Sequence, residues 1–342
     1  DEVPQLSSQV TWRDTLKRWS LRWGVGRESS AVVPGLYRVG MPTPSSPVVV
    51  TCNYQMTVDL VRRDLEGIDA WLLVLETYGI NVWCAAGKKT FGTDELVRRI
   101  FATHLADYVD HETLILPQLG AVGVAAHEVR QLSGYRVVWG PVRSADLRAF
   151  IEAGNKTTPE MRAVTFTFPE RIALMPMEIV PSLRYALYAI PALLVLAVLG
   201  ASIAMRAFTP LAALMGLFPS LMMFVLAVFA GAVMVPALLP WLPGRAFTVK
   251  GAVAGAVLAL LALIALPGML GGQSVLGWAA VLLAVSSAAS YVGVNFTGST
   301  PYTSPSGVEA ELRRAIPLEV AGIAIALVCW TVAWAITIGR IR

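Results

Sequence analysis

The sequence predicts an α/β domain in the first half of the chain, followed by an all-α transmembrane domain of five helices. Two observations support this division. Short strand-like runs alternate with amphipathic segments between residues 46 and 168, and acidic residues are almost confined to the first half, with none between Glu178 and Glu309. Leu, Ala, Val, Met and Phe dominate that interval, and a bilayer makes buried carboxylates costly. The second half is therefore expected to lie in a membrane.

The first half contains five short runs rich in β-branched and apolar residues, which predict parallel strands joined by crossover helices. These strands are expected at residues 48–51, 71–76, 113–116, 136–139 and 163–168. Helices are expected at residues 57–65, from an N-cap at Thr93, at 124–132 and at 145–153. The domain of residues 46–168 is thus predicted to be Rossmann-like, with residues 1–45 as an N-terminal extension. In such sheets ligands collect at the carboxyl ends of the strands.

The second half contains five stretches long enough to cross a bilayer. They are residues 185–205, 213–241, 249–268, 274–295 and 317–338, preceded by a linker at 169–183, within a transmembrane domain of residues 184–342. The distribution of flanking Arg and Lys favours an α/β domain on the cytoplasmic side of the inner membrane. The polar stretch 295–316 is then a cytoplasmic loop, which is equally consistent with a functional segment and with a solvated connector. No ionisable residue lies mid-span, which argues against an ion pathway.

Charge and cysteine content exclude several classes of protein. The formal net charge is +4, but the basic residues are dispersed rather than clustered, which argues against a nucleic-acid-binding protein. The three cysteines, Cys52, Cys84 and Cys329, show neither disulfide-like nor zinc-like spacing, which favours a reducing compartment. The chain begins at Asp1 without an initiator Met or a signal-peptide pattern, and a trimmed or fragmentary amino terminus is expected.

The segment from Asn81 to Thr93 is the strongest candidate for chemistry. It follows a predicted strand and begins with a residue able to cap a helix, and its thiol, Cys84, is flanked by Trp83 and small alanines. The positive field at a helix amino end favours a thiolate, which can bind a soft or borderline metal. A buried structural cysteine remains the alternative on position alone.

Two other chemistries fail on spacing. A phosphate-binding loop would need Gly and Ser or Thr at the positions of Val82 and Lys89. A Cys–His nucleophile has no local signature around His104, His111 or His127.

The segment Asn81-Val82-Trp83-Cys84-Ala85-Ala86-Gly87-Lys88 resembles the cap-helix signature of the mercury-methylating corrinoid protein family, HgcA. Residues 51–54, 117–120, 123–128 and 140–143 also resemble the cofactor domain of the corrinoid iron–sulfur protein large subunit, so that similarity spans most of residues 46–178. That related protein carries Thr where this sequence has Cys84. Lys89 stands where Gly is expected.

The resemblance implies a corrinoid-binding α/β domain that holds cobalamin or a related cobamide, with its lower base displaced into the domain. It implies that Cys84 is the catalytic residue and the lower axial ligand of cobalt. The other cofactor-binding residues it implies are Thr51, Asn53, Asn81, Val82, Trp83, Ala85, Ala86, Gly87, Lys88, Thr90, Phe91, Gln118, Leu119, Gly120, Gly123, Val124, Gly140 and Pro141.

The implied activity is a corrinoid-dependent methyltransferase that passes a methyl group from cobalt to inorganic Hg(II), giving methylmercury. The methyl donor would be a tetrahydrofolate-linked methyltransferase route, and the reductant a ferredoxin-like iron–sulfur protein, HgcB. Three cysteines are too few for an iron–sulfur cluster, which usually takes four thiolates. The alternative is a membrane-anchored corrinoid methyl carrier of the acetyl-CoA pathway type with a different acceptor. A transporter with a regulatory soluble domain is a third hypothesis, which the uncharged spans disfavour.

Overall fold

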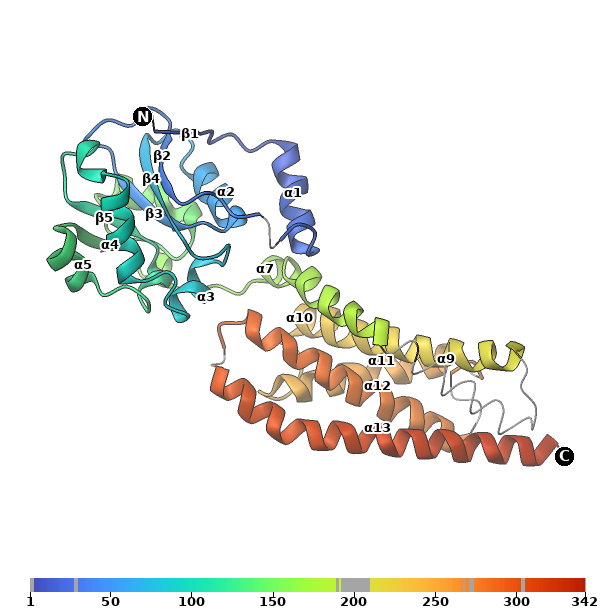
Figure 1. The fold of residues 1–342 in the computed structure, drawn as a ribbon. Coiled ribbons are helices and arrows are strands. Elements are labelled where there is room, and N and C mark those ends of the chain that lie inside the picture. Colours follow the sequence, from blue (N-terminus) through green and yellow to red (C-terminus); the bar gives the residue numbers. More distant parts are fainter. Residues whose placement is uncertain are drawn as a thin grey trace. The chain divides into compact units, whose positions relative to one another are not determined.

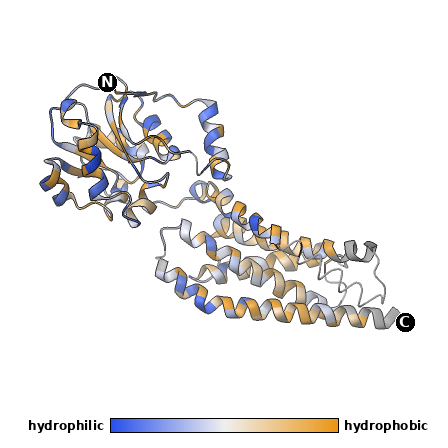
Figure 2. Cartoon of the chain, viewed as in Figure 1, coloured by the Kyte–Doolittle hydropathy of each residue, from blue (hydrophilic) through white to orange (hydrophobic). Residues whose placement is uncertain are grey.

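The computed structural model describes residues 3–27, 30–188, 191, 210–266, 268–270, 274–302 and 305–341 (Figure 1). The chain divides into two compact units, Asp1–Thr165 and Phe166–Arg342. The first is an α/β unit and the second consists of helices, as predicted. Hydrophilic and hydrophobic residues are mixed in the first unit, whereas long hydrophobic stretches dominate the helices of the second (Figure 2).

The α/β unit is built on a six-stranded sheet with the order β1-β2-β4-β3-β5-β6. The strands are β1 (Gln5–Leu6), β2 (Gly35–Val39), β3 (Val48–Cys52), β4 (Ala70–Leu75), β5 (Thr113–Leu116) and β6 (Arg136–Trp139). Strands β3 to β6 pair in parallel, at the places where the sequence predicts strands, while β2 runs antiparallel to β4. The closer description of this sheet as Rossmann-like stays a prediction.

Residues 1–45, predicted as an extension, are part of the α/β unit. They supply β1, helix α1 (Trp12–Arg22) and β2, and β2 pairs with β4 along its whole length. The short β2 segment, Gly-Leu-Tyr-Arg-Val, lacks the long apolar run that marks the inner strands. The sheet therefore begins before the predicted domain boundary at residue 46.

The strand predicted at residues 163–168 is wrong. A short 3₁₀ turn covers Glu160–Arg162, and helix α7 (Phe168–Ile172) begins at the N-cap residue Thr167. The Thr167 backbone N–H and hydroxyl both donate to the Glu170 carboxylate, at 2.6 and 2.9 Å. This capping box, with Pro169 in the first turn, starts a helix where apolar and polar residues alternate as in a strand.

Helices cover both faces of the sheet. Helices α2 (Gln55–Asp64) and α6 (Leu147–Glu152) pack on one face, against Val49, Leu72 and Ile115. The other face, with Val50, Leu73 and Leu116, is covered by α3 (Val82–Gly87), α4 (Thr93–Ala102) and α5 (Ala126–Ser133). Burial on both sides explains the nearly continuous apolar sequence of β3 and β4.

The predicted N-cap at Thr93 is also wrong. Gly92 occupies the N-cap position of α4, and the Thr93 hydroxyl instead accepts a hydrogen bond from the Ala125 backbone N–H at 2.9 Å. That bond ties the start of α4 to the segment before α5. Asp94 and Glu95 do lie in the first turn of α4, where the helix dipole favours acidic residues.

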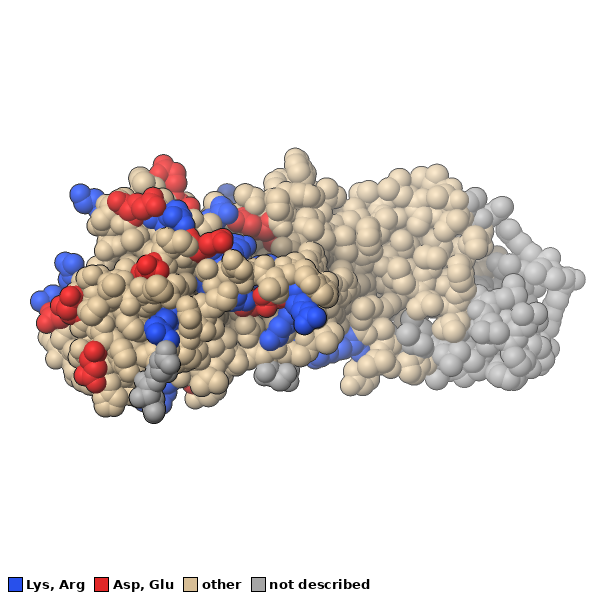
Figure 3. Space-filling model, turned by 90° about the horizontal axis from the view of Figure 1, so that it is seen from above, with Lys and Arg blue, Asp and Glu red and all other residues tan. Residues whose placement is uncertain are grey.

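Among its described residues, the second unit contains four helices long and apolar enough to cross a membrane: Leu217–Leu238, Phe247–Ala265, Val275–Ser299 and Ser306–Ala333. They comprise most of α9 (Pro210–Phe229), a π-helical turn at Ala230–Met234, α10 (Val235–Leu238), α11 (Phe247–Ala265), α12 (Val275–Asn295), a 3₁₀ turn at Phe296–Ser299 and most of α13 (Pro305–Ile341). Most of the span predicted at 185–205 lies outside the described residues. In the view of Figure 3, charged side chains cluster on the α/β unit, and the helical unit shows a broad uncharged surface.

The loop predicted at residues 295–316 is much shorter in the structure. Its first part forms the 3₁₀ turn Phe296–Ser299, and α13 begins at Pro305. Pro305 is suited to a first helical turn, and Arg313 and Glu309 form an ion pair one turn apart at 2.7 Å. The polar composition that suggests a loop thus belongs largely to the first turns of a helix.

Candidate functional site

A cavity of about 450 Å³ lies at the carboxyl ends of the parallel strands. The chain leaves β3 toward α2 on one face of the sheet and leaves β5 toward α5 on the other. Because β3 and β5 are neighbours, their connections diverge and open a crevice, the usual ligand position in such sheets. The cavity is lined by the ends of β3 and β5, by α2, by the start of α6 and by the first residues of α3.

Helix α3 presents Cys84 at the surface. Its N-cap is Asn81, whose Oδ1 accepts a hydrogen bond from the Cys84 backbone N–H at 2.9 Å. Val82, Ala85 and Ala86 are buried against the domain, whereas Trp83, Cys84, Gly87 and Lys88 are exposed. The alternative of a buried structural cysteine is therefore wrong for Cys84.

The outer face of α3 is open as well as exposed. A Cβ atom added to Gly87 would meet no atom within 4 Å. Gly87 lies three residues after Cys84, so both occupy one side of the helix. Trp83, 42% exposed, adds an aromatic ring beside them. The Gly87 side of this face thus leaves room for a ligand beside the thiol.

The other two cysteines differ from Cys84. Cys52 ends β3 and is fully buried, and burial raises the pKa of its thiol, which keeps it protonated. Cys329 is partly buried in α13. Cys84 is thus the one exposed thiol among the three.

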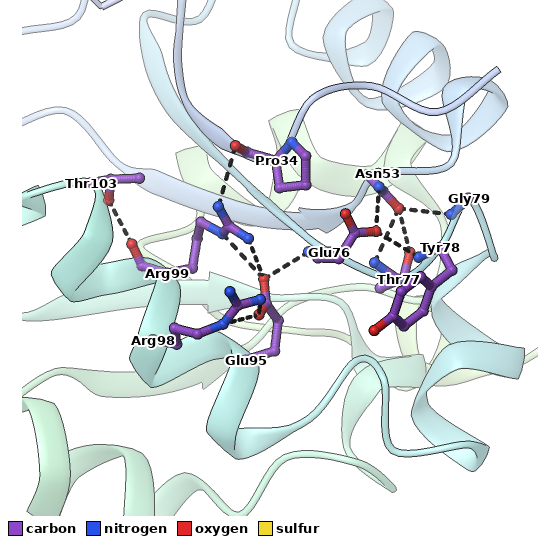
Figure 4. A network of polar contacts seen from close by, with 10 residues as sticks. All are labelled: Pro34, Asn53, Glu76, Thr77, Tyr78, Gly79, Glu95, Arg98, Arg99 and Thr103. Atoms are coloured by element: carbon purple, nitrogen blue, oxygen red, sulfur yellow. Dashed lines mark hydrogen bonds and ion pairs between the residues drawn. The ribbon is translucent and has the colours of Figure 1, made fainter. Parts of the chain in front are cut away.

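Asn53 organises the turn that leads into α3 (Figure 4). Its Oδ1 accepts from the Thr77 N–H (3.1 Å), the Thr77 hydroxyl (2.8 Å) and the Gly79 N–H (3.0 Å), and its Nδ2 donates to Glu76 Oε1 at 2.7 Å. The Tyr78 N–H also donates to Glu76 Oε1, at 2.7 Å. The Asn53 side chain is buried, at 2% exposed, and its amide group makes four hydrogen bonds to residues of this turn. It is therefore a structural hub of the turn.

A second part of the network joins α4 to the end of β4 (Figure 4). Glu95 Oε1 accepts from the Glu76 backbone N–H at 2.8 Å and from Arg99 Nη2 at 2.7 Å, and Glu95 also pairs with Arg98. Arg99 Nη1 donates to the Pro34 carbonyl at 3.3 Å. The turn before α3 is therefore held from two sides.

Close packing explains the glycines beneath α3. A Cβ atom on Gly123 would lie 2.2 Å from the Phe91 carbonyl oxygen and 3.0 Å from Ala86 Cα, and one on Gly120 would lie 2.6 Å from the Phe91 ring. Real side chains do not tolerate such distances. These residues support α3 from below.

The structure divides the predicted site residues into two groups. Those that line the cavity are Thr51, Asn81, Val82, Trp83, Leu119, Gly140 and Pro141. Those that do not line it are Asn53, Cys84, Ala85, Ala86, Gly87, Lys88, Thr90, Phe91, Gln118, Gly120, Gly123 and Val124. In the second group, Cys84, Gly87 and Lys88 share the outer face of α3, and most of the others support that helix or the turn before it.

Sequence reasoning missed the wall of the cavity formed by α2 and the start of α6. Thr57, Leu60, Val61 and Asp64 line it at helical spacing, together with Arg63 and Ser144. Asp64 accepts hydrogen bonds from Ser144 Oγ at 2.5 Å and from Arg63 Nε at 2.7 Å. These residues reach the crevice because β3 lies beside β5 in the sheet, and this strand order cannot be read from the local sequence.

Lys89 follows Lys88, the C-cap residue of α3, and adopts a left-handed conformation with φ of 61°. This region favours glycine, which is the residue expected here from the family resemblance. We expect Lys89→Gly to change the unfolding free energy of the α/β unit by about 1–2 kcal/mol relative to Lys88→Gly, in the stabilising direction, because Lys88 has an ordinary φ of −91°. Thermal unfolding of both variants measures this. Equal effects of the two changes would contradict strain at Lys89.

Residues 20–151 match the model of the CdhD family, described as the CO dehydrogenase/acetyl-CoA synthase delta subunit. The chain is also similar to the gamma subunit of the acetyl-CoA decarbonylase/synthase complex of Methanopyrus kandleri, with 37% identity over 128 residues, 37% of this chain and 27% of that protein. The gamma subunit from Archaeoglobus fulgidus is 32% identical over 123 residues, 35% of this chain and 26% of that protein. The gamma subunit from Methanocaldococcus jannaschii is 32% identical over 127 residues, 36% of this chain and 26% of that protein.

The family match covers most of the α/β unit and none of the helices from α7 onward. The chain spans about a quarter of the length of these curated relatives. The comparisons thus relate the α/β unit to the CdhD family and to acetyl-CoA decarbonylase/synthase gamma subunits, and they do not show the mercury-methylating role that the cap-helix resemblance implies.

Proposed function

We propose that the α/β unit binds a cobalt corrinoid, cobalamin or a related cobamide, and that this chain is a membrane-anchored carrier of methyl groups. The observation that carries the proposal is the exposed Cys84 face of α3, whose first residues line the cavity at the carboxyl ends of β3 and β5. The similarity to acetyl-CoA decarbonylase/synthase gamma subunits supports this assignment.

The residues present fit such a cofactor in two places. The cavity has the size of a small-molecule site, and its mainly apolar wall suits the lower base of a cobamide. Thr51, Leu119, Gly140 and Pro141 would hold that part. The open face with Cys84 and Gly87 would take the flat ring, because no side chain obstructs it at Gly87.

The corrinoid, when bound, supplies the cobalt centre that carries the methyl group. The protein supplies the position and the polarity of the site. Asn81 fixes the backbone of Cys84 through its 2.9 Å hydrogen bond. A Cys84 thiolate is a soft ligand suited to a transition metal, and it would hold the cobalt of a bound corrinoid. The neighbouring alanines, buried beneath it, keep α3 close to the sheet.

Inorganic Hg(II) is a second candidate acceptor, suggested by the resemblance of the segment around Cys84 to the mercury-methylating corrinoid family. The Cys84 thiolate would donate electron density to the bound cobalt, which would favour delivery of a methyl group to an electrophile such as Hg(II). A hydroxyl at this position, as in the related corrinoid iron–sulfur protein, donates less. This candidate requires the same site and differs only in the acceptor.

Each cycle of methyl transfer would also need a methyl donor and a low-potential reductant. The three cysteines of this sequence are fewer than the four thiolates that a cluster usually takes. A ferredoxin-like protein such as HgcB is therefore the proposed reductant, and a tetrahydrofolate-linked methyltransferase route the proposed donor. The positive-inside distribution supports a cytoplasmic α/β unit at the inner membrane.

A visible absorption spectrum tests the proposal. The full chain, purified from cells supplied with cobalamin, is expected to show a corrin chromophore. Leu60 is half-buried in the cavity wall, and Leu60→Trp would fill the space and lower bound corrinoid by about tenfold or more. Val122→Trp is the control, because Val122 is 80% exposed and does not line the cavity. A colourless wild-type protein would remove every corrinoid hypothesis.

A further inference from the structure

Helix α1 carries a row of exposed apolar side chains. Trp12, Leu16, Trp19 and the C-cap residue Trp23 are 68%, 58%, 51% and 44% exposed. They stand at positions i, i+4, i+7 and i+11, which places all four on one side of the helix. We call this row the α1 stripe. Soluble surfaces show isolated apolar residues, but a contiguous row of three tryptophans and a leucine indicates a contact surface.

The α1 stripe is not the face that packs on the α/β unit. Leu21, 1% exposed, belongs to the hydrophobic core, and Asp14 pairs with Arg62 of α2 at 3.3 Å. Leu21 and Asp14 lie on the opposite side of the helix from the stripe at 3.6 residues per turn. A capping box between Thr11 and Asp14 fixes the start of the helix. The structure therefore holds α1 firmly with its tryptophans turned away from the core.

Basic residues border the α1 stripe. Arg13 and Lys17 are exposed on one side of it, and Arg18 and Arg22 are half-buried on the other. The Arg13 guanidinium lies 5.5 Å from the centre of the Trp12 ring. Asp14, the one acidic residue of α1, is engaged by Arg62. The exposed surface of the helix is thus aromatic and positively charged.

We propose that α1 lies in the headgroup region of the bilayer, with the α1 stripe inserted and its basic border against anionic lipids. Tryptophan is enriched at membrane interfaces, and each basic residue near an anionic surface adds attraction. The described part of the same chain holds four helices long and apolar enough to cross a membrane, and the α/β unit joins the helical unit directly at Thr165 and Phe166. This tether keeps the stripe at a high effective concentration near lipid. The family match begins at residue 20, so most of α1 lies outside the residues that match the family.

A depth measurement on the full chain in lipid nanodiscs tests the proposal. A fluorescent amino acid replaces Leu16 by stop-codon suppression, and quenching by doxyl-labelled lipid is measured in phosphatidylcholine with and without phosphatidylglycerol. The matched probe replaces Val122, which is also highly exposed but lies outside α1. We expect quenching at position 16 to exceed that at position 122 by about threefold or more, to rise with phosphatidylglycerol and to fall with salt.

Two further variants separate the contributions of the surface. Arg13→Gln with Lys17→Gln is expected to lower the ratio of inserted to free helix about tenfold in the anionic discs, because two attractions to the surface are lost. Trp12→Ser with Trp19→Ser should abolish quenching in both lipids. Equal, weak quenching at positions 16 and 122 in both lipids would overturn the proposal. The proposal would also be overturned if the probe at position 16 were protected from solvent only after a soluble protein was added, and not by lipid. Neither result depends on corrinoid binding.

Discussion

Replacing Cys84 with alanine is expected to lower the rate of methyl transfer by more than about 100-fold. Substitution of a residue that only hydrogen-bonds to a metal ligand usually costs less than this. In the proposed corrinoid site the thiol on the exposed face of α3 would be the soft donor to cobalt, and alanine would remove it. Because the side chain is exposed and its backbone is held by Asn81, the fold should be unaffected. Single-turnover transfer from the methylated protein, with the methylated product measured by mass spectrometry, gives the rate.

Two control variants make this result specific. Cys52→Ala removes a buried thiol at the end of β3 and should leave the transfer rate within about threefold, since its effect is a small core cavity. Cys84→Thr, which introduces the residue of the related corrinoid iron–sulfur protein, distinguishes the two acceptors. Loss of transfer to Hg(II) with retained corrinoid binding would favour mercury as the acceptor. Undiminished transfer by Cys84→Ala would contradict the axial-thiolate assignment.

The inner strands were predictable because their burial is two-sided. β3 and β4 are almost uninterrupted runs of apolar residues, so each can be predicted as a strand from its own sequence, without knowing which strands pair with it. β2 owes its position to pairing with β4, a contact distant in sequence that a single short segment does not reveal. The error at residues 163–168 has a local cause. A capping box and a first-turn proline, which together indicate the start of a helix, are present at Thr167, Glu170 and Pro169. The Thr and Phe residues that alternate at 165–168 have the pattern of a strand, and this pattern led to the wrong prediction.

The candidate site was predictable only where it is local. The N-cap Asn81 and a thiol near the amino end of a helix follow from a short segment, and the structure places both on α3. The exposure of Cys84 does not follow from its position in the sequence. The wall contributed by Leu60 and Ser144 depends on β3 lying beside β5, which is a property of the sheet order. Asn53 lies at the predicted edge of the sheet, but its side chain bonds to the turn before α3. A polar residue at a strand end can thus serve the site through its neighbours.

Asn53→Ala should consequently destabilise the α/β unit by about 3 kcal/mol and loosen α3. The change leaves the backbone N–H groups of Thr77 and Gly79 without their acceptor, and each buried unsatisfied group costs about 1–3 kcal/mol. The turn also holds Tyr78 and Gly79 at φ of 57° and 66°, a conformation that a non-glycine residue keeps only when its surroundings enforce it. Without Asn53, Tyr78 is free to relax toward negative φ.

Hydrogen exchange of residues 77–88 in the full chain measures this loosening directly, and alkylation of Cys84 reports it independently. We expect exchange in this segment to accelerate by about 100-fold, as local opening becomes some 3 kcal/mol easier. Gln55→Ala is the matched control. Gln55 lies two residues after Asn53, but its side chain donates a hydrogen bond to Asp59 within α2, at 3.1 Å, and not to the turn before α3. Its effect should stay below about 1 kcal/mol. If Asn53→Ala left exchange in residues 77–88 unchanged, the position of Cys84 would have to depend on the packing of Phe91 and Gly123 beneath α3 instead of on the Asn53 hub.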